Sequence, residues 1–144
     1  MAYIDPQHVD SPKSFVSDLM PVYDGGEWES SVALLKWEGE DRVAMRWNGG
    51  TENQSQKPTP GNPQSRGLPT WFVVDPIFDV AILQTLLEKR LAGGGSIDKE
   101  KAQEAIHRAI ELRTSSREAS IAPDQLLEQK VLAILEKFKS EGKI

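Results

Sequence analysis

The chain has 144 residues, no cysteine and a formal net charge of −5. This length suits one ordinary domain with one core, and the lack of cysteine excludes disulfides and thiolate metal sites. The acidity lies in the first third: residues 1–24 carry one Lys against four Asp, residues 25–48 carry three basic against five acidic residues, and the remainder balances. No cluster of Lys and Arg stands out, so we expect no general binding to duplex DNA.

Other broad classes are also disfavoured. No run of about 18 apolar residues occurs, and the start MAYIDPQHVD lacks the basic and apolar regions of a signal peptide. We therefore expect a cytoplasmic protein with no membrane contact. His8 and His107 lie far apart and the acids are scattered, which indicates no metal site. No phosphate-binding glycine loop precedes a helix, so we expect no cofactor.

We interpret the first 24 residues as an N-terminal arm, rich in Asp and Pro. Ser11 as N-cap and Pro12 at the first helical position predict a short helix. Its apolar face would hold Phe15, Val16 and Leu19. The rest of the arm is expected to be extended.

Residues 28–48, WESSVALLKWEGEDRVAMRWN, predict a β-hairpin, because β-branched and aromatic residues flank a short turn that contains glycine. A three-residue loop over 39–41 would place Glu38 opposite Arg42. A two-residue turn at Gly39 and Glu40 is the competing register. In the first register one face, the expected core face, holds Ala33, Leu35, Trp37, Val43, Met45 and Trp47.

A third short strand is predicted over residues 70–74, TWFVV. Asp75 as N-cap and Pro76 at the first position then start a helix. This helix is apolar over much of its circumference, so we expect a central helix covered on two sides. Its apolar residues are Ile77, Phe78, Val80, Ala81, Ile82, Leu83, Leu86, Leu87 and Leu91.

Three glycines at 93–95 predict the end of that helix and a hinge. Two helical segments follow, about 97–113 and 123–139, and together they predict an antiparallel helical hairpin. The first has a thin stripe of Ala102, Ile106, Ala109 and Ile110, and the second a wider one of Leu127, Val131, Ile134, Leu135 and Phe138. The predicted organisation is thus an arm over 1–24, an α+β core over 25–92 and a helical hairpin over 96–144, in one compact domain.

A long polar loop divides the predicted core. The stretch RWNGGTENQSQKPTPGNPQSRGLPTWFVVDP has a run of about twenty residues without a large apolar side chain. Loops of this length in compact domains are usually functional or disordered. We expect its part from Gly50 to Thr59 to be mobile, whereas GNPQSRGLPTW has the residues of a shaped turn.

The run RWNG, a polar gap, GNPQSRGLPTWFV and a following apolar helix resemble small uncharacterised bacterial proteins of the accessory genome, of the mobile-element or integron-cassette kind. The resemblance covers about Tyr23 to Leu87. It implies that the two ends of the loop belong together, and it implies no activity.

The candidate ligand-binding residues lie beside this loop. They are Arg46, Asn48, Ser65, Arg66 and Trp71. Arg46 is expected on the strand face opposite Met45 and Trp47, and two arginines near aromatic rings suit a carboxylate, a phosphate or a base. The alternative is that Arg66 only binds backbone carbonyls of the loop and that the tryptophans belong to the core. We assign no catalytic residue, since neither histidine fits a nucleophile–His–acid pattern.

The predicted fold is α+β: a small antiparallel sheet made of the hairpin and a third strand, packed on a central helix and followed by the helical hairpin. The predicted function is a non-enzymatic binding or adaptor protein, a homodimer through its apolar helical surface. The alternative is binding of a small anionic ligand or single-stranded nucleic acid through the arginines and tryptophans beside the 49–67 loop.

Overall fold

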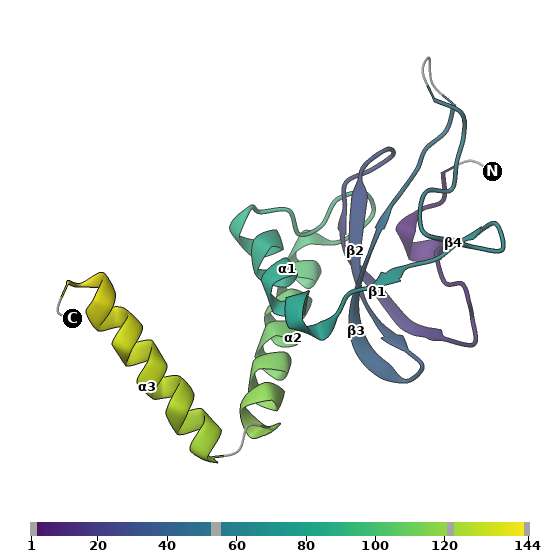
Figure 1. Cartoon of the computed structure of the whole chain (residues 1–144). Helices are drawn as coiled ribbons and strands as arrows, with labels where there is room; N and C mark the ends of the chain where they lie inside the picture. Colours follow the sequence, from purple (N-terminus) through teal and green to yellow (C-terminus); the bar gives the residue numbers. More distant parts are fainter. Residues whose placement is uncertain (1–2, 53–55, 121–122, 143–144) are drawn as a thin grey trace. The chain divides into compact units, whose positions relative to one another are not determined.

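The computed structural model describes residues 3–52, 56–120 and 123–142, and within these ranges it does not describe the side chains of residues 116–129. The predicted α+β class is confirmed by a four-stranded antiparallel sheet and three helices (Figure 1). The chain divides into two compact units, Met1–Ile110 and Glu111–Ile144. The sheet lies in the first unit.

The main sheet has the strand order β1-β2-β3-β6. These strands are β1 (Val16–Asp24), β2 (Ser30–Trp37), β3 (Glu40–Trp47) and β6 (Phe72–Val73). A second, two-stranded sheet consists of β4 (Gln64–Ser65) and β5 (Leu68–Pro69). The predicted third strand is therefore present as β6 but is shorter than expected.

The β2–β3 hairpin forms as predicted, with a different register. Trp37 pairs with Glu40, so the turn consists of Glu38 and Gly39, which have φ angles of 53° and 84°. Two successive residues with positive φ form the tight turn that matches the twist of a hairpin. Neither predicted turn is correct, and the observed register differs from the three-residue-loop register by an odd number of residues.

This change of register corrects the predicted core face. Ala33 and Leu35 share one face with Ala44, whereas Val43 and Met45 lie on the other. An odd shift moves the residues of one strand to the opposite face relative to its partner. Both faces of the sheet are consequently apolar and both are covered.

The short helix predicted from Ser11 is wrong. The amides of Phe15 and Val16 both donate to the carbonyl of Pro12, which makes a single turn, and β1 begins at Val16. Pairing with β2 gives this segment more backbone hydrogen bonds than one isolated helical turn would provide. A 3-10 helix, η1 (Pro6–His8), precedes the turn. The predicted arm thus supplies an edge strand of the sheet.

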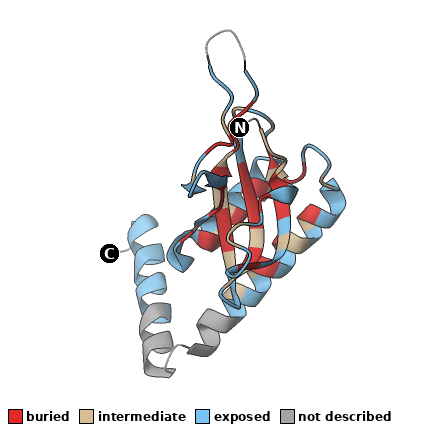
Figure 2. Ribbon diagram, turned by 90° about the vertical axis from the view of Figure 1, so that its right-hand side faces the viewer, coloured by how far each residue is buried: buried red, intermediate tan, exposed pale blue. Residues whose placement is uncertain are grey.

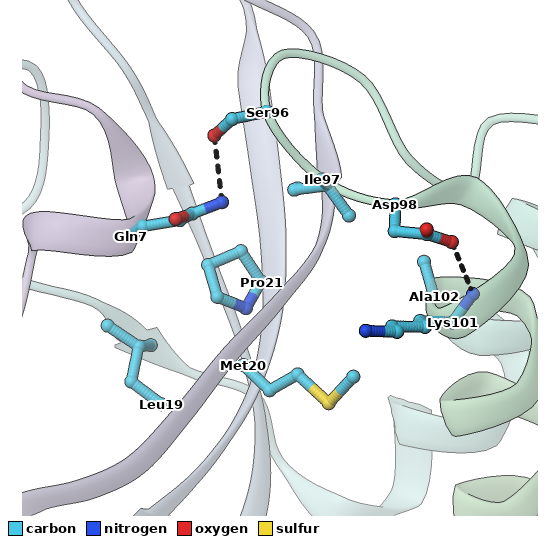
Figure 3. A pocket seen from close by; sticks show the side chains of 9 residues that line it. All are labelled: Gln7, Leu19, Met20, Pro21, Ser96, Ile97, Asp98, Lys101 and Ala102. Carbon is cyan, nitrogen blue, oxygen red and sulfur yellow. Dashed lines mark hydrogen bonds between the residues drawn. The ribbon is translucent and has the colours of Figure 1, made fainter.

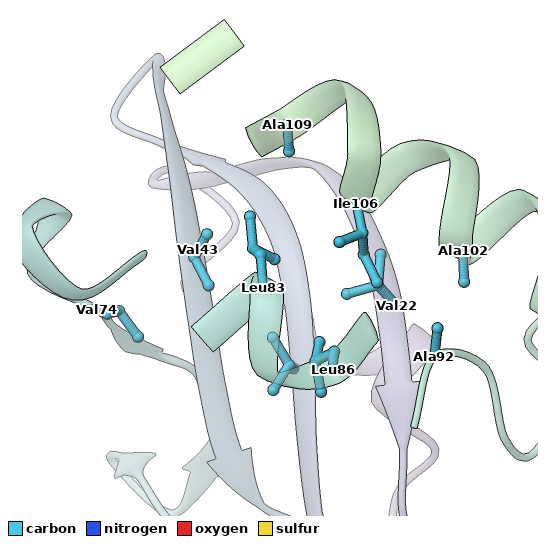
Figure 4. Close-up of a cluster of buried hydrophobic side chains, with 10 residues drawn as sticks. Val22, Val43, Val74, Leu83, Leu86, Ala92, Ala102, Ile106 and Ala109 are labelled. Carbon is cyan, nitrogen blue, oxygen red and sulfur yellow. The ribbon is translucent and has the colours of Figure 1, made fainter. Parts of the chain in front are cut away.

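Two apolar clusters hold the first unit together, one on each face of the sheet. The helices α1 (Pro76–Glu88) and α2 (Lys99–Ser120) cover one face, and the N-terminal segment covers the other (Figure 1). The first cluster, drawn in Figure 4, comprises Val22, Val32, Val43, Val74, Leu83, Leu86, Ala92, Ala102, Ile106 and Ala109. The second comprises Val9, Val16, Ala33, Leu35, Ala44 and Trp71. Figure 2 shows the buried residues concentrated on the strands between these layers.

Helix α1 begins as predicted. The side chain of Asp75 accepts a hydrogen bond of 3.0 Å from the amide of Ile77, and Pro76 stands at the first position. Leu83 and Leu86 are buried between the sheet and α2, which gives the helix its second partner. Its first turn differs from the prediction, because Ile77 and Phe78 are exposed.

The stripe predicted on α2 is buried, except for the partly buried Ile110, and its neighbours are the sheet and α1. Ala102, Ile106 and Ala109 all lie in the first cluster. Within the second unit, α3 (Pro123–Ser140) extends nearly over the predicted range. Docking of its apolar stripe stays a prediction, and the Leu127 side chain lies outside the described residues.

The glycine segment after α1 forms backbone hydrogen bonds with the edge strand β1. The amide of Gly93 donates to the carbonyl of Val22, and the amide of Asp24 donates to the carbonyl of Gly93, with distances of 2.8 and 2.9 Å. Gly94 has a φ of 94°, and a Cβ atom there would overlap the Asp24 carbonyl. The prediction that these glycines end the helix is wrong: α1 ends at Glu88, where Arg90 has a φ of 56° and the amide of Leu91 donates to the Leu86 carbonyl. Gly93 instead pairs with β1.

The two ends of the long loop pair with each other. Trp47 pairs with Asn62 and Gly50 pairs with Thr59 as isolated antiparallel bridges. A Cβ atom on Gly50 would overlap the ring of Trp28. The loop is thus a ribbon with closely packed stems, while residues 53–55, part of the segment predicted to be mobile, lie outside the described residues.

The close packing of the stems predicts a contrast between two glycine substitutions. Gly61 and Gly67 have similar φ angles of 86° and 78°, but a Cβ atom on Gly61 would overlap the Trp47 carbonyl, whereas one on Gly67 meets nothing within 4 Å. Gly67→Ala should cost about 1–2 kcal/mol of unfolding free energy for its φ alone. Gly61→Ala should cost more, by about 1–3 kcal/mol for overpacking. Urea unfolding of both variants measures the difference, and equal losses would contradict the packing of the stems.

Candidate functional site

Arg46, the first candidate residue, is buried inside the loop. It lies in β3, two residues after Ala44 of the second cluster and on the face opposite Met45, as predicted. Its guanidinium donates short hydrogen bonds to the carbonyls of Pro60 and Thr70 and a longer one, 3.5 Å, to that of Pro63. These carbonyls span the shaped turn, so Arg46 ties that turn to the centre of the sheet.

The charge of Arg46 is compensated by backbone dipoles. Only 3% of the residue is exposed, and no acidic group forms an ion pair with it among the described residues. Burial lowers the pKa of Arg46 to about 10, with an opposing effect from Tyr3. The guanidinium is still protonated at neutral pH, and its Nε atom has no hydrogen-bond partner. This arrangement leaves the cation enclosed, with no open face for an incoming anion.

Asn48 belongs to a separate buried network. Its Nδ2 donates to Asp24 Oδ1 at 3.1 Å and to the Gly26 carbonyl at 2.8 Å, while its Oδ1 accepts from the Ser31 hydroxyl at 2.8 Å. Asn48 is fully buried and Asp24 is 7% exposed. Tyr3 lies beside the Asp24 carboxylate, and burial and the charge of Asp24 raise the pKa of Tyr3 to about 12. The network fixes the turn between β1 and β2.

Trp71 is a core residue. It is 3% exposed, lies in the second cluster, and its Nε1 donates to the Val9 carbonyl at 2.6 Å. This bond joins the strand region after the loop to the N-terminal segment. The other tryptophans are partly buried, and the rings of Trp28 and Trp47 lie 5.8 Å apart.

Ser65 and Arg66 differ from the other three candidates, because both are exposed. Arg66 and Gly67 form the turn of the exposed β4–β5 hairpin, and Arg66 has a φ of 52°. The Arg66 side chain makes no hydrogen bond or ion pair within the described part of the chain. The structure thus buries Arg46, Asn48 and Trp71 with internal partners and leaves Ser65 and Arg66 in solvent, without joining the five in one open cleft. The carbonyl-binding role that the sequence allowed for Arg66 belongs to Arg46.

Two groups of exposed apolar side chains lie elsewhere among the described residues. In the second unit, α3 presents a row of side chains that are 38–55% exposed: Val131, Leu132, Ile134, Leu135 and Phe138. In the first unit, Phe72 of the edge strand β6 is 60% exposed, and Ile77 and Phe78 at the start of α1 are 73% and 57% exposed. The sequence indicated this α3 row by its helical spacing, apart from Leu132. It gave no sign that the first turn of α1 would be uncovered.

Among the residues that the structure describes, no group of three or more His, Cys, Asp or Glu side chains is placed to hold a metal ion. No helix in that part of the chain is both long and apolar enough to cross a bilayer. In comparisons with protein-family models, curated proteins and solved structures, nothing matches the chain.

The contrast between the two arginines predicts different costs of removal. Arg46→Met leaves the buried carbonyls of Pro60 and Thr70 without a donor and should lower the unfolding free energy by about 2–4 kcal/mol. Arg66→Met should change it by less than about 0.5 kcal/mol, since its side chain lies in solvent. Urea unfolding measures both.

The same two variants test whether the arginines form an anion site. With added phosphate, the unfolding midpoints of the parent and of both variants should shift equally. Stabilisation by phosphate that is lost in Arg46→Met would contradict the internal role of Arg46. Stabilisation by phosphate that is lost in Arg66→Met would restore an anion site at Arg66.

Proposed function

We propose that this chain is a non-enzymatic binding or adaptor protein that forms a homodimer through α3. The observation that carries the proposal is the exposed row of apolar side chains on α3. Ile134, Leu135 and Phe138 follow Val131 at spacings of three, four and seven residues, which places them on one face of the helix. Contiguous exposed apolar faces on soluble proteins mark sites where another surface binds.

A second copy of the same helix is the simplest cover. A two-fold dimer places the same patch of both chains in contact, so an apolar row can pair with itself without a second specialised surface. Burial of each large side chain stabilises by about 1.5–3 kcal/mol relative to exposure. A five-turn helix with five such side chains can therefore supply the association energy of a dimer.

The exposed side chains of the first unit supply a second surface, which suits an adaptor. Phe72, Ile77 and Phe78 lie within seven residues of one another, on an edge strand and the helix that follows it. Aromatic side chains are enriched where proteins bind one another. We assign this surface to a protein partner in the cytoplasm, the location that the sequence favours. The setting we propose is the bacterial accessory genome, whose small proteins the sequence resembles.

The alternative function, binding of a small anion or single-stranded nucleic acid through the Arg/Trp cluster, has less support. Two of the three described guanidinium contacts of Arg46 are short bonds to carbonyls, and Trp71 is buried. Stacking on a base requires an exposed ring, and phosphate binding requires free donors.

The dimer proposal predicts a defined effect of charge in the α3 row. Leu135→Glu should convert a dimer into a monomer, because each chain would bury a carboxylate against an apolar partner. Glu136→Gln is the matched control on the neighbouring position and should leave the dimer intact. Light scattering coupled to size-exclusion chromatography measures the mass. A parent protein that is monomeric at all concentrations, or a dimer that Leu135→Glu leaves unchanged, would rule out dimerisation through α3.

A further inference from the structure

A cavity of about 300 Å³ lies in the first unit, between η1, β1 and the start of α2 (Figure 3). Its volume falls at the lower end of the range for small-molecule sites, roughly 300–1,000 Å³. Its apolar wall includes Leu19, Met20, Pro21 and Ile97. No residue of this cavity takes part in the proposed α3 dimer or in the surface around Phe72.

The irregular backbone of β1 shapes this wall. In a regular strand successive side chains point to opposite faces, so three consecutive residues do not line one hollow. Here Leu19, Met20 and Pro21 all line the cavity, and the pairing of β1 with β2 shifts register both between Ser17 and Met20 and between Pro21 and Tyr23. Bulges of this kind redirect side chains and are frequent beside binding sites.

The polar wall carries two opposite charges. Asp98 accepts a hydrogen bond of 2.9 Å from the amide of Lys101 through Oδ1 and thereby caps the start of α2. Within the described residues, its second carboxylate oxygen and the Lys101 ammonium have no partner. In Figure 3 the Lys101 side chain extends from α2 toward the middle of the cavity.

A solvent-exposed hydrogen bond between distant segments borders the cavity. Gln7 Nε2 donates to the hydroxyl oxygen of Ser96 at 2.8 Å, which joins η1 to the turn before α2 across 89 positions of sequence. The Ser96 hydroxyl proton remains available to a further acceptor. The cavity thus combines one cation, one carboxylate and one hydroxyl donor with an aliphatic wall.

We propose that this cavity binds a small zwitterion with an apolar side chain, of the chemical class of the aliphatic α-amino acids. The ligand carboxylate accepts from the Lys101 ammonium and from the Ser96 hydroxyl, and its ammonium donates to Asp98. Its aliphatic side chain packs on Leu19, Met20 and Pro21. An anion alone would leave Asp98 unpaired beside it, and a cation alone would leave Lys101 unpaired, so the zwitterion matches both walls.

The test uses three ligands with the same branched aliphatic body. Leucine carries both charges, isocaproate lacks the ammonium and isoamylamine lacks the carboxylate. NMR titration of the full chain should give saturable shifts of the Met20 methyl and the Ser96 amide with leucine, with a Kd of about 1 mM. Each of the other two ligands should bind at least about fivefold more weakly, because each loses one charge-assisted contact.

Substitutions of Lys101 and Asp98 test which charge of the ligand each residue binds. Lys101→Met should weaken the affinity for leucine to that of the parent protein for isoamylamine. Asp98→Asn, which keeps a capping oxygen, should weaken the affinity for leucine to that of the parent protein for isocaproate. Lys99→Met is the control, on the same helical turn and outside the cavity lining. No saturable shift with leucine, equal binding of the three ligands, or equal losses in Lys99→Met and Lys101→Met would each overturn the proposal.

Discussion

The structure of the first unit depends on one buried cation. Arg46 stands on β3, an inner strand of the sheet, and its guanidinium binds carbonyls at Pro60 and Thr70. An unpaired charge in an apolar interior is costly, so the segment from 60 to 70 must stay folded around it. This contact holds the end of the long loop and the start of β6 against the sheet. The polar loop therefore serves the fold, because it supplies the backbone oxygens that solvate a buried guanidinium.

The glycines of the loop follow from the same constraint. The turn over 60–70 must return close to β3, and Gly61 lies against the backbone of Trp47 and Asn48, where any Cβ atom would overlap. The amides of Trp47 and Asn62 each donate to the other residue's carbonyl at 2.9 Å. Small residues thus permit the close approach that Arg46 then fixes. With the arginine engaged internally, the surfaces that we propose for binding are the apolar ones on α3 and at the start of α1, together with the cavity beside β1.

The sequence predicted what local patterns encode. Asp75 and Pro76 placed the start of α1, and the spacing of Ala102, Ile106 and Ala109 identified the buried face of α2. Both signals act within a few residues of the chain. The α+β class followed from them together with the hairpin.

Features set by distant contacts were missed for physical reasons. The turn at Glu38 and Gly39 needs a positive φ at a glutamate, which no common turn signal announces. The two register shifts of β1 remove the alternation that identifies a strand. Arg46 and Trp71 donate to backbone carbonyls. Every residue has a carbonyl, so residue types in the sequence do not reveal these partners. The sequence could therefore name candidate residues without showing that their donors are engaged internally.

The guanidinium NMR signals of Arg46 test the central claim most directly. If carbonyls of the loop hold this group, its Nη protons should give separate signals at neutral pH, with slow rotation and slow exchange with water, and added phosphate should leave them unchanged. The Arg66 signals in the same spectrum should be averaged, as expected of a side chain in solvent. Averaged, rapidly exchanging signals for Arg46, or signals that move as phosphate is added, would contradict the account.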